Sequence, residues 1–458
     1  MSRRAEAVPP VEQFAREIAP ETVQNVSSAS AIRVVNRIKT LNEAFADPEA
    51  ARQRAAEIKD YVLDNLKDLL IQLEAKCLEH GIRVHWARDA ERARRIALEI
   101  CRAAYPDGGT IVKAKSMLTE EIHLNPFLEE NGYRPVETDL GEYVVQLEHD
   151  TPSHIITPIV HMNRGQVATA FEREGLGPHT EDPGELTMQA RSKLRSYFRE
   201  AQIGISGVNF AIAETGRIVL VENEGNNRLS TTAPDLHIAF MGIEKILPRE
   251  ADLALFLRLL GCSATAQHMT GYVHLIGGPR SEERDGPREV HLILVDNGRT
   301  RILGNQYREI LRCIRCGACQ NVCPVYRRVS GHAYHHVYGG PIGAVLAPAL
   351  DGIEKMGWVA KASSLCGACE EVCPVRIPIP RMLLQIRDEA VRAGAIHESV
   401  PWSLFARGAT SGWQWRTGLK LLPLATKVPH PLKKGWTEYR ALPHRVGRSF
   451  RSWWNERS

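Results

Sequence analysis

The sequence predicts an α/β domain with a largely parallel sheet, followed by an all-α domain built around cysteines. Three observations support this prediction. Strand-like and helix-like patterns alternate over about 200 residues in the middle of the chain. Strand patterns stop near residue 304, and seven of the ten cysteines fall between Cys313 and Cys373. A chain of 458 residues is also too long for one ordinary core, which favours two to four domains.

The N-terminal part is expected to be a helical arm covering residues 1–70. Residues 1 to about 30 contain several prolines and are interpreted as irregular. From residue 31 to 104 apolar residues recur at three- and four-residue spacing, which predicts helices over 51–81 and 89–104. Gly81 is a suitable stop for the first of these.

The α/β domain is expected to cover residues 71–300. Short runs rich in Val and Ile predict strands, and amphipathic runs predict the intervening helices. The strands are predicted at 109–116, 142–148, 154–162, twice within 208–225, and at 236–248, 271–279 and 289–299; the helices are predicted at 187–202 and 250–262.

Residues 301–395 are predicted to form the cysteine-containing helical domain, with helices at 305–313 and 379–394. Its two cysteine runs are similar to each other. The first, CIRCGACQNVCP (313–324), has the spacing C-x2-C-x2-C-x3-C-P, and the second, SSLCGACEEVCP (363–374), repeats it with Ser363 in place of the first cysteine. This spacing is typical of bacterial 4Fe-4S proteins, because three close thiolates wrap three corners of a cubane and the fourth cysteine ligates the neighbouring cluster. Gly317 and Gly367 allow the backbone to pass close to the cluster.

Because the fourth cysteine of each run ligates the cluster of the other run, the ligands of each cluster can be assigned. Cluster 1 is expected to be held by Cys313, Cys316, Cys319 and Cys373. Cluster 2 is expected to be held by Cys323, Cys366 and Cys369, with Ser363, a histidine, water or a partner's side chain at its fourth iron, or with that iron lost.

Two other interpretations of the cysteines are weaker. A four-cysteine zinc site pairs two C-x2-C knuckles and needs no third cysteine followed by C-P. Disulfides are disfavoured because the N-terminus lacks a secretory h-region, which favours a reducing cytoplasm. The scattered Cys77, Cys101 and Cys262 are interpreted as small buried hydrophobes.

Two stretches of the middle domain are specific: KAKSMLTEEIHLNPFLEENG (113–132) and FAIAETGRIVLVENEGNNRLST (210–231). Together with the cysteine runs and a Trp-rich tail, they resemble the lactate-utilization iron–sulfur protein family, component B of a three-protein L-lactate oxidation system. The resemblance covers nearly the whole chain. It implies a lactate-utilization α/β domain related to sugar-phosphate isomerases and CoA transferases, and an α-helical ferredoxin domain with two 4Fe-4S clusters held by seven cysteines.

The resemblance further implies an electron-transfer subunit of a complex that oxidises L-lactate to pyruvate and allows growth on lactate. Its expected partners are two companion lactate-utilization proteins and a respiratory electron acceptor. Rival hypotheses are a subunit for another 2-hydroxy acid such as glycolate, and a redox-responsive ligand-binding module. The catalytic residues are not identified by the sequence, and whether the chain is itself an enzyme is left open.

Other residues offer weaker signals. Lys113, Lys115, Ser116 and the segment 119–121 follow a strand, and the polar loop 222–232 lies between strands, so either could contact a ligand. The histidines of 332–340 could tune the incomplete cluster or simply be structural. No G-x-G-x-x-G opens a helix, so a nicotinamide cofactor is not indicated.

The tail, 396–458, is basic and rich in Trp and shows no sustained period. From Pro401 onward it holds eleven Lys and Arg against two Asp and Glu, and six of the eight Trp. Wrapping of the protein's own domain and docking to a partner are favoured. Contact with the inner face of the membrane is a further alternative, and nucleic-acid binding is not expected. No stretch is long and apolar enough for a spanning helix, so the expected location is the cytoplasm.

Overall fold

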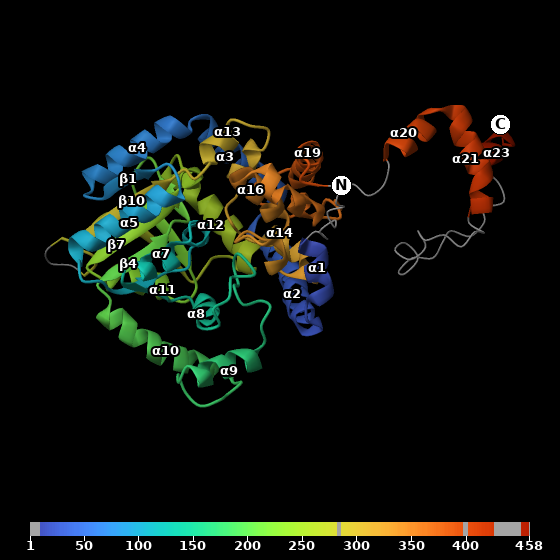
Figure 1. The fold of residues 1–458 in the computed structure, drawn as a ribbon. Coiled ribbons are helices and arrows are strands. Elements are labelled where there is room, and N and C mark those ends of the chain that lie inside the picture. Colours follow the sequence, from blue (N-terminus) through green and yellow to red (C-terminus); the bar gives the residue numbers. More distant parts are fainter. Residues whose placement is uncertain (1–9, 282–284, 397–401, 426–449, 458) are drawn as a thin grey trace, which may run out of the picture. The chain divides into compact units, whose positions relative to one another are not determined.

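The computed structural model describes residues 10–281, 285–396, 402–425 and 450–457. The chain divides into two compact units, Met1–Ile396 and His397–Ser458, and Figure 1 shows the elements of both. The first unit contains the α/β domain, the cysteine runs and the N-terminal helices.

A six-stranded parallel sheet forms the centre of the α/β domain, as the alternation of patterns predicted. Its strand order is β1-β10-β7-β4-β2-β3, and all five neighbouring pairs are parallel. The strands are β1 (Arg83–Ala87), β2 (Gly109–Lys113), β3 (Tyr133–Glu137), β4 (Ile203–Gly207), β7 (Leu236–Gly242) and β10 (Glu289–Val295).

Both faces of this sheet are buried, as expected for parallel strands connected by helices. On β7, Ile238 and Phe240 pack into the core under α5 (Ala90–Ala104) and α7 (Leu124–Glu130), whereas Ala239 and Met241 pack into the core under α4 (Leu66–Glu79). Helices α8 (Leu140–Leu147), α9 (Arg164–Arg173) and α10 (Pro183–Glu200) form smaller clusters beside β2 and β3.

A second, four-stranded sheet has the order β8-β5-β6-β9. Its strands are β5 (Phe210–Ile212), β6 (Ile218–Glu222), β8 (Ile246–Leu247) and β9 (Tyr272–Ile276), and α12 (Glu250–Thr265) packs on it. The short helices α6 (Met117–Glu121), α11 (Asn226–Thr232) and η1 (Ile243–Lys245) follow strands β2, β6 and β7.

Several element predictions were wrong. Residues 142–148 were expected to be a strand but lie in α8, whose first turn is capped by the Asp139 carboxylate accepting from Glu142 N. Residues 154–162 form turns and no strand. The single helix predicted over 51–81 is two helices, α3 (Pro48–Asp64) and α4, separated at Asn65.

The N-terminal arm is more regular than expected and does not form a separate layer. The segment interpreted as irregular contains α1 (Pro10–Glu17) and α2 (Pro20–Ala44). Helix α2 packs against α12 and against two helices of the cysteine region, α14 (Ala318–Val322) and α15 (Tyr326–Val329). Figure 1 shows the blue N-terminal helices beside the orange helices of residues 310–395.

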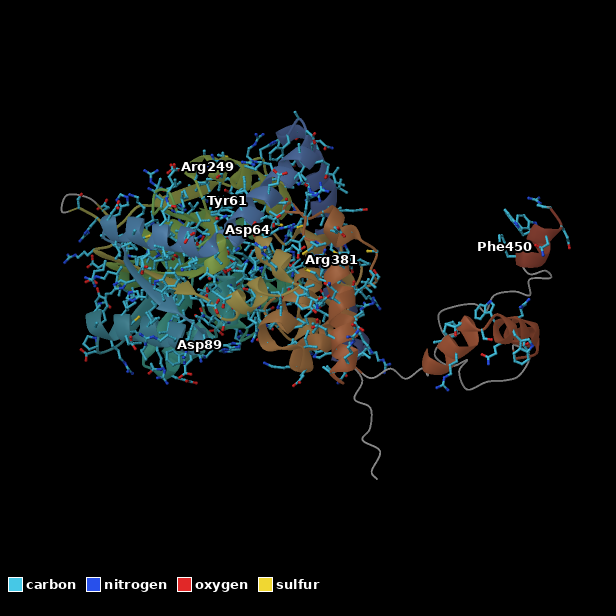
Figure 2. All side chains as sticks on the ribbon, turned by 90° about the horizontal axis from the view of Figure 1, so that it is seen from above. Tyr61, Asp64, Asp89, Arg249, Arg381 and Phe450 are labelled. Carbon is cyan, nitrogen blue, oxygen red and sulfur yellow. The ribbon has the colours of Figure 1, made fainter. Side chains whose placement is uncertain are left out.

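The cysteine region, residues 301–396, contains helices and turns and no strand. Its elements are α13 (Arg299–Leu303), η2 (Arg308–Arg312), α14, α15, η3 (His332–Tyr334), α16 (Gly340–Asp351), α17 (Ile353–Met356), η4 (Gly357–Lys361), α18 (Ala368–Glu371) and α19 (Ile379–Arg392). The helix predicted at 305–313 is only the short η2. Its start is tied to other segments, because Arg308 pairs with Asp64 of α3 and Glu309 accepts from Arg381 of α19 at 2.6 Å; Figure 2 labels Asp64 and Arg381.

The second unit contains α20 (Trp402–Thr410), α21 (Gly412–Ala425) and α23 (Phe450–Asn455), so its described part is helical although no period was found. Phe405 and Trp415 make an edge-to-face contact between α20 and α21, with ring centroids 6.3 Å apart. In the described parts of the chain, no helix is both long and apolar enough to cross a membrane. The proposed roles of this tail stay predictions.

Candidate iron–sulfur site and adjoining cavity

The two cysteine runs have the same backbone conformation. Arg315 and Leu365, at equivalent positions directly before Cys316 and Cys366, have φ values of 60° and 54°. Gly317 and Gly367 follow that cysteine with φ values of 70° and 88°. Non-glycine residues seldom adopt the left-handed region, so its recurrence at matched positions indicates that both loops are shaped for the same purpose.

Backbone N–H groups point at the cysteine sulfurs and at the serine that replaces one of them. Cys313 Sγ accepts from Arg315 N at 3.4 Å, and Ser363 Oγ accepts from Leu365 N at 3.1 Å. Ser363 Oγ therefore occupies the same place in its loop as Cys313 Sγ does in the first. Cys323 Sγ and Cys373 Sγ each accept a further N–H at 3.4 Å.

The structure brings the seven cysteines together in two groups. The thiol of Cys316 interacts electrostatically with those of Cys313 and Cys373, and Cys319 interacts with the same three sulfurs. Cys369 interacts with Cys323 and Cys366. Cys319 also interacts with Cys369, so the two groups are adjacent.

These thiols fit an iron–sulfur cofactor better than a free-thiol function. Burial raises the pKa of Cys316 and of Cys369 to about 12 and that of Cys373 to about 11. Such thiols stay protonated at neutral pH and are poor nucleophiles. A metal cluster that displaces their protons supplies the positive charge that stabilises buried thiolates.

The two groups differ in exposure. Cys316, Cys323, Cys369 and Cys373 are buried, whereas Cys366 is exposed and Ser363 is half-buried. The group containing Cys366 therefore reaches the protein surface. Cys77, Cys101 and Cys262 are fully buried, which confirms their interpretation as small core residues.

Two arginines from the N-terminal helices hold the end of the second run. Arg52 of α3 donates to Cys373 O at 2.9 Å and to Glu370 O at 3.1 Å, and Arg37 of α2 donates to Val372 O at 2.6 Å. Both arginines are buried. These contacts could not be predicted from the sequence, because more than 300 residues separate the arginines from the carbonyls.

A cavity of about 330 Å³ lies where the parallel strands end and the first cysteine run begins. Lys115 and Ser116 after β2, Gly207 at the end of β4 and Lys245 after β7 line one part of it. The polar loop 222–227 lines another, and Arg315 and Tyr338 contribute from the cysteine region. The structure thus brings together 113–121, 222–232 and the first cysteine run, which the sequence singled out separately.

A buried ion-pair network forms one wall of the cavity. Arg299 pairs with Glu121 at 2.8 Å and with Glu244 at 2.7 Å, and Arg315 lies 3.5 Å from Glu244. The guanidinium of Arg315 also stacks 4.6 Å from the ring centroid of Tyr338. This wall is rigid, since each charged group has at least one fixed partner.

Two lysines on the cavity have no such partner. Among the residues the structure describes, no carboxylate lies within 4.0 Å of Lys115 or Lys245. Lys115 Nζ donates to Ile155 O, and Lys245 Nζ makes one long bond of 3.4 Å to Cys313 O. Burial, with the nearby charge of Arg315, lowers the pKa of Lys245 to about 7. The nearest counter-charges act at longer range, Glu244 on Lys245, and Glu142 and Glu224 on Lys115, so among the described residues neither amine has a carboxylate in direct contact.

The other candidate residues of this segment have structural roles. Lys113 is buried and forms ion pairs with Glu137 at 2.5 Å and with Glu120 at 3.1 Å. Its charge is therefore neutralised inside the domain. Ser116 caps α6 through Thr119 N, and Glu121 belongs to the Arg299 network.

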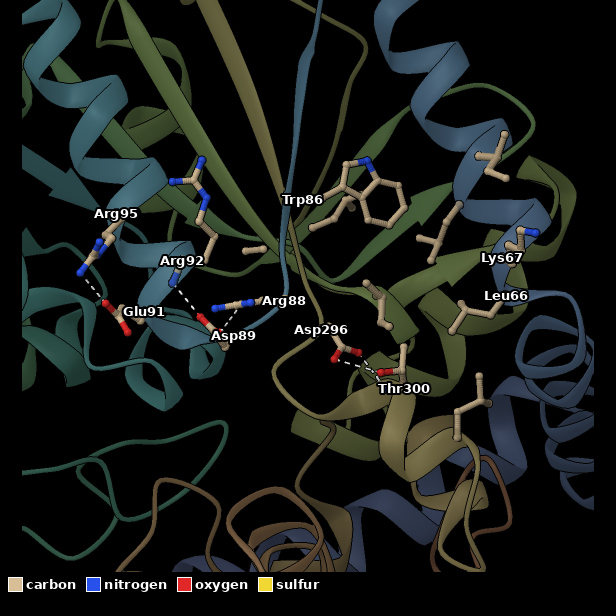
Figure 3. Close-up of a pocket in the computed structure, with 16 residues that line it drawn as sticks. Leu66, Lys67, Trp86, Arg88, Asp89, Glu91, Arg92, Arg95, Asp296 and Thr300 are labelled. Atoms are coloured by element: carbon tan, nitrogen blue, oxygen red, sulfur yellow. Dashed lines mark hydrogen bonds and ion pairs between the residues drawn. The ribbon is translucent and has the colours of Figure 1, made fainter.

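A second, larger cavity of about 810 Å³ lies between α4, β1 and the start of α5 (Figure 3). Four of its charged residues pair with one another, Arg88 with Asp89 at 2.9 Å and Arg95 with Glu91 at 2.5 Å. It is lined by no residue of either cysteine run. Size alone therefore does not mark it as the functional site.

The histidines of 332–340 contact residues other than the cysteines. His332 donates to Thr151 O at 2.7 Å and packs on His161, with ring centroids 4.7 Å apart. His335 packs on Trp358 and His336 on Tyr338. Within the described part of the chain, none of these hydrogen bonds or ring contacts reaches a cysteine, which favours the structural interpretation.

Comparison with known proteins identifies the family. Models of the LUD domain, the 4Fe-4S dicluster domain and the C-terminal domain of lactate utilisation protein B match residues 70–295, 309–377 and 380–458. Lactate utilization protein B of Bacillus subtilis (strain 168) is 42% identical over 461 residues, covering 97% of this chain and 96% of that protein. The chain belongs to the lactate utilization protein B family. The resemblance predicted from its motifs is thereby confirmed.

Other members extend the same likeness. Lactate utilization protein B of Bacillus licheniformis is 43% identical over 94% of this chain and 93% of its own length. An Escherichia coli (strain K12) member named uncharacterized electron transport protein YkgF is 43% identical over 92% of this chain and 90% of its own. The family's dicluster model covers all seven cysteines of the two runs, so the prediction of a 4Fe-4S protein holds.

Proposed function

We propose that this protein is the iron–sulfur electron-transfer subunit of a complex that oxidises L-lactate to pyruvate and allows growth on lactate. The observation that carries the proposal is the pair of cysteine loops with matched backbones in a chain that belongs to this family over its whole length. Relatives named for lactate utilization and for electron transport support the same role.

The arrangement supports two 4Fe-4S clusters with crossed ligands. Cluster 1 takes Cys313, Cys316, Cys319 and Cys373, whose thiols interact electrostatically with one another. Cluster 2 takes Cys323, Cys366 and Cys369, with Ser363 Oγ at its fourth iron. When bound, such clusters accept and release single electrons.

The protein's own residues supply the rest of the function. Arg37 and Arg52 fix the segment that carries Cys373, and the basic wall around Arg315 lies beside Cys313. Because Cys366 is exposed, cluster 2 is the point of contact with an electron acceptor or companion protein, and cluster 1 faces the α/β domain. Electrons from lactate therefore pass from the α/β side to the surface.

The test is genetic and spectroscopic. Deletion of the gene should abolish growth on L-lactate and spare growth on pyruvate, and the wild-type gene should restore it. Cys369→Ala should fail to restore growth and lose about half of the iron. Cys101→Ala, which removes a buried thiol in a core cluster that holds no cysteine of the runs, should restore growth fully.

The purified complex then distinguishes the substrates. L-lactate should reduce the clusters, as seen by EPR, and glycolate should reduce them more slowly. Growth on lactate after deletion, in a strain without another lactate dehydrogenase, would contradict the proposal. Faster reduction by glycolate would reassign the substrate while leaving the electron-transfer role.

A further inference from the structure

We infer that the cavity beside Cys313 is a binding site for a small 2-hydroxy or 2-oxo carboxylate, held between Lys115 and Lys245. This inference rests on the proposed function and adds to it the place where the substrate or product lies. It also places that ligand on this chain, next to the first cysteine run.

The position of the cavity fits a ligand site. Lys115, Gly207 and Lys245 each follow or end a strand of the parallel sheet, so the cavity lies outside the carboxyl ends of β2, β4 and β7. Open α/β sheets bind their ligands in this place. A volume of about 330 Å³ is enough for a molecule of six heavy atoms with a few waters.

The two lysines donate the hydrogen bonds to the carboxylate of the ligand. An ammonium has three donors, and each of these lysines uses one of them on a backbone carbonyl, Ile155 O or Cys313 O. The remaining donors face a cavity in which neither amine has a carboxylate within ion-pair distance among the described residues. A ligand carboxylate between them makes the direct charged hydrogen bonds that no carboxylate of the described residues makes.

Amide groups on the same cavity match the oxygen at carbon 2. Asn209 Oδ1 accepts from Val221 N at 2.9 Å, and Asn223 Oδ1 accepts from Gly271 N at 2.8 Å. These bonds fix the amides so that each NH₂ group is the side available for a ligand. An NH₂ group donates to a hydroxyl or a keto oxygen but gives no bond to a plain methylene, which provides discrimination against propionate.

The cavity also touches the cysteine run. Arg315, between Cys313 and Cys316, lines it, and Lys245 bonds the Cys313 carbonyl. A ligand in the cavity therefore changes the surroundings of cluster 1 directly. No residue of the second cysteine run lines the cavity.

The experiment uses the full-length protein, purified anaerobically with its clusters. Binding of L-lactate, pyruvate and propionate is measured by calorimetry, and the EPR spectrum of the reduced protein is recorded with and without pyruvate. We expect saturable binding of L-lactate and pyruvate, weaker binding of propionate, and a change in only one of the two cluster signals. Lys115→Met and Lys245→Met should each weaken binding about 10- to 100-fold, as expected for loss of a charged hydrogen bond.

Lys67→Met is the matched control, because Lys67 lines the other, larger cavity. It should leave affinity unchanged. Variants are compared only at equal iron and sulfide content, which excludes misfolding as the cause. Binding that survives both lysine substitutions, equal loss in Lys67→Met, or propionate binding as tight as lactate would each overturn the inference. If lactate reduces the clusters of the complex while this chain binds no lactate, the cavity is refuted and the proposed function stands.

Discussion

Arg52 should control how firmly the protein holds cluster 1. It is buried and donates two hydrogen bonds to the backbone, one to the carbonyl of Cys373 itself. Hydrogen bonds from a charged donor contribute about 1.5 kcal/mol or more each, so replacing Arg52 by Met should cost about 3 kcal/mol. Its ion pair with the exposed Glu49 adds little to this figure.

The cost should appear as local opening of the segment that carries Cys373. Because 1.4 kcal/mol is a tenfold change in an equilibrium constant, the open fraction should rise about 100-fold. The assay is anaerobic release of iron to a chelator, whose rate follows the open fraction when closing is fast. Arg52→Met should therefore release iron about 100-fold faster than the wild type.

Two further variants sharpen this test. Arg54 lies on the same helix with its side chain 56% exposed, so Arg54→Met should behave as the wild type. Arg52→Lys keeps the charge but cannot reach both carbonyls, and about tenfold faster release is expected. Equal rates for Arg52→Met and Arg54→Met would refute the reasoning, because the buried bonds would then contribute nothing to cluster retention.

Three other predictions follow from single residues. Ser363→Cys should give cluster 2 a fourth thiolate and alter its EPR signal, while Ser363→Ala should favour loss of its fourth iron on oxidation; identical spectra would exclude serine as a ligand. Burial lowers the pKa of His237 to about 3, so as the pH falls the imidazole is protonated in the unfolded state before it is protonated in the folded state. The free energy of unfolding should therefore fall by about 1.4 kcal/mol from pH 8 to pH 5.5 through this residue. Denaturant titrations of His237→Gln should lack this change. A Cβ at Gly331 would lie 1.8 Å from Ser153 O, so Gly331→Ala should lower stability by about 1–3 kcal/mol, whereas Gly277→Ala has open space and should not; equal melting curves would contradict this packing argument.

The fold was predictable where burial imposes a clear pattern and unpredictable where it does not. The interior strands β2, β7 and β10 are buried apolar runs and were found as strands, whereas the interior strand β4 was missed because its two glycines weaken the strand pattern. Strands β1 and β3 were missed, and they are the two edges of the sheet. Edge strands carry polar residues and proline, as Arg83–Ala87 and Tyr133–Glu137 do, so their signal is weak.

The two false strands have different causes. Residues 142–148 follow Asp139, and an Asp three residues before Glu142 is a helix-start signal that outweighs the Val-Val pair. Residues 154–162 are apolar because another region covers them: Ile155 is 3% exposed, and its N–H donates to Gln320 of the cysteine region at 3.2 Å. No local pattern can distinguish burial by a distant segment from burial in a sheet.

The cysteine runs were recognisable because spacing alone encodes a cluster loop. The cavity was not, since it requires Lys115, Lys245 and Arg315, three residues spread over 200 positions, to meet at one point. Arg315 was the one residue in the sequence that could have indicated the cavity, because it is a charged residue inside a predicted cluster-binding loop.

The hydrogen bond from Arg52 to the Cys373 carbonyl also determines when cluster 1 can form during synthesis. The two residues are 321 positions apart, and ribosomes add about 5–20 residues per second. Cys373 is therefore synthesised roughly 15 to 65 s after Arg52. Until then the last ligand of cluster 1 does not exist, so stable insertion of iron is postponed until almost the whole polypeptide has left the ribosome.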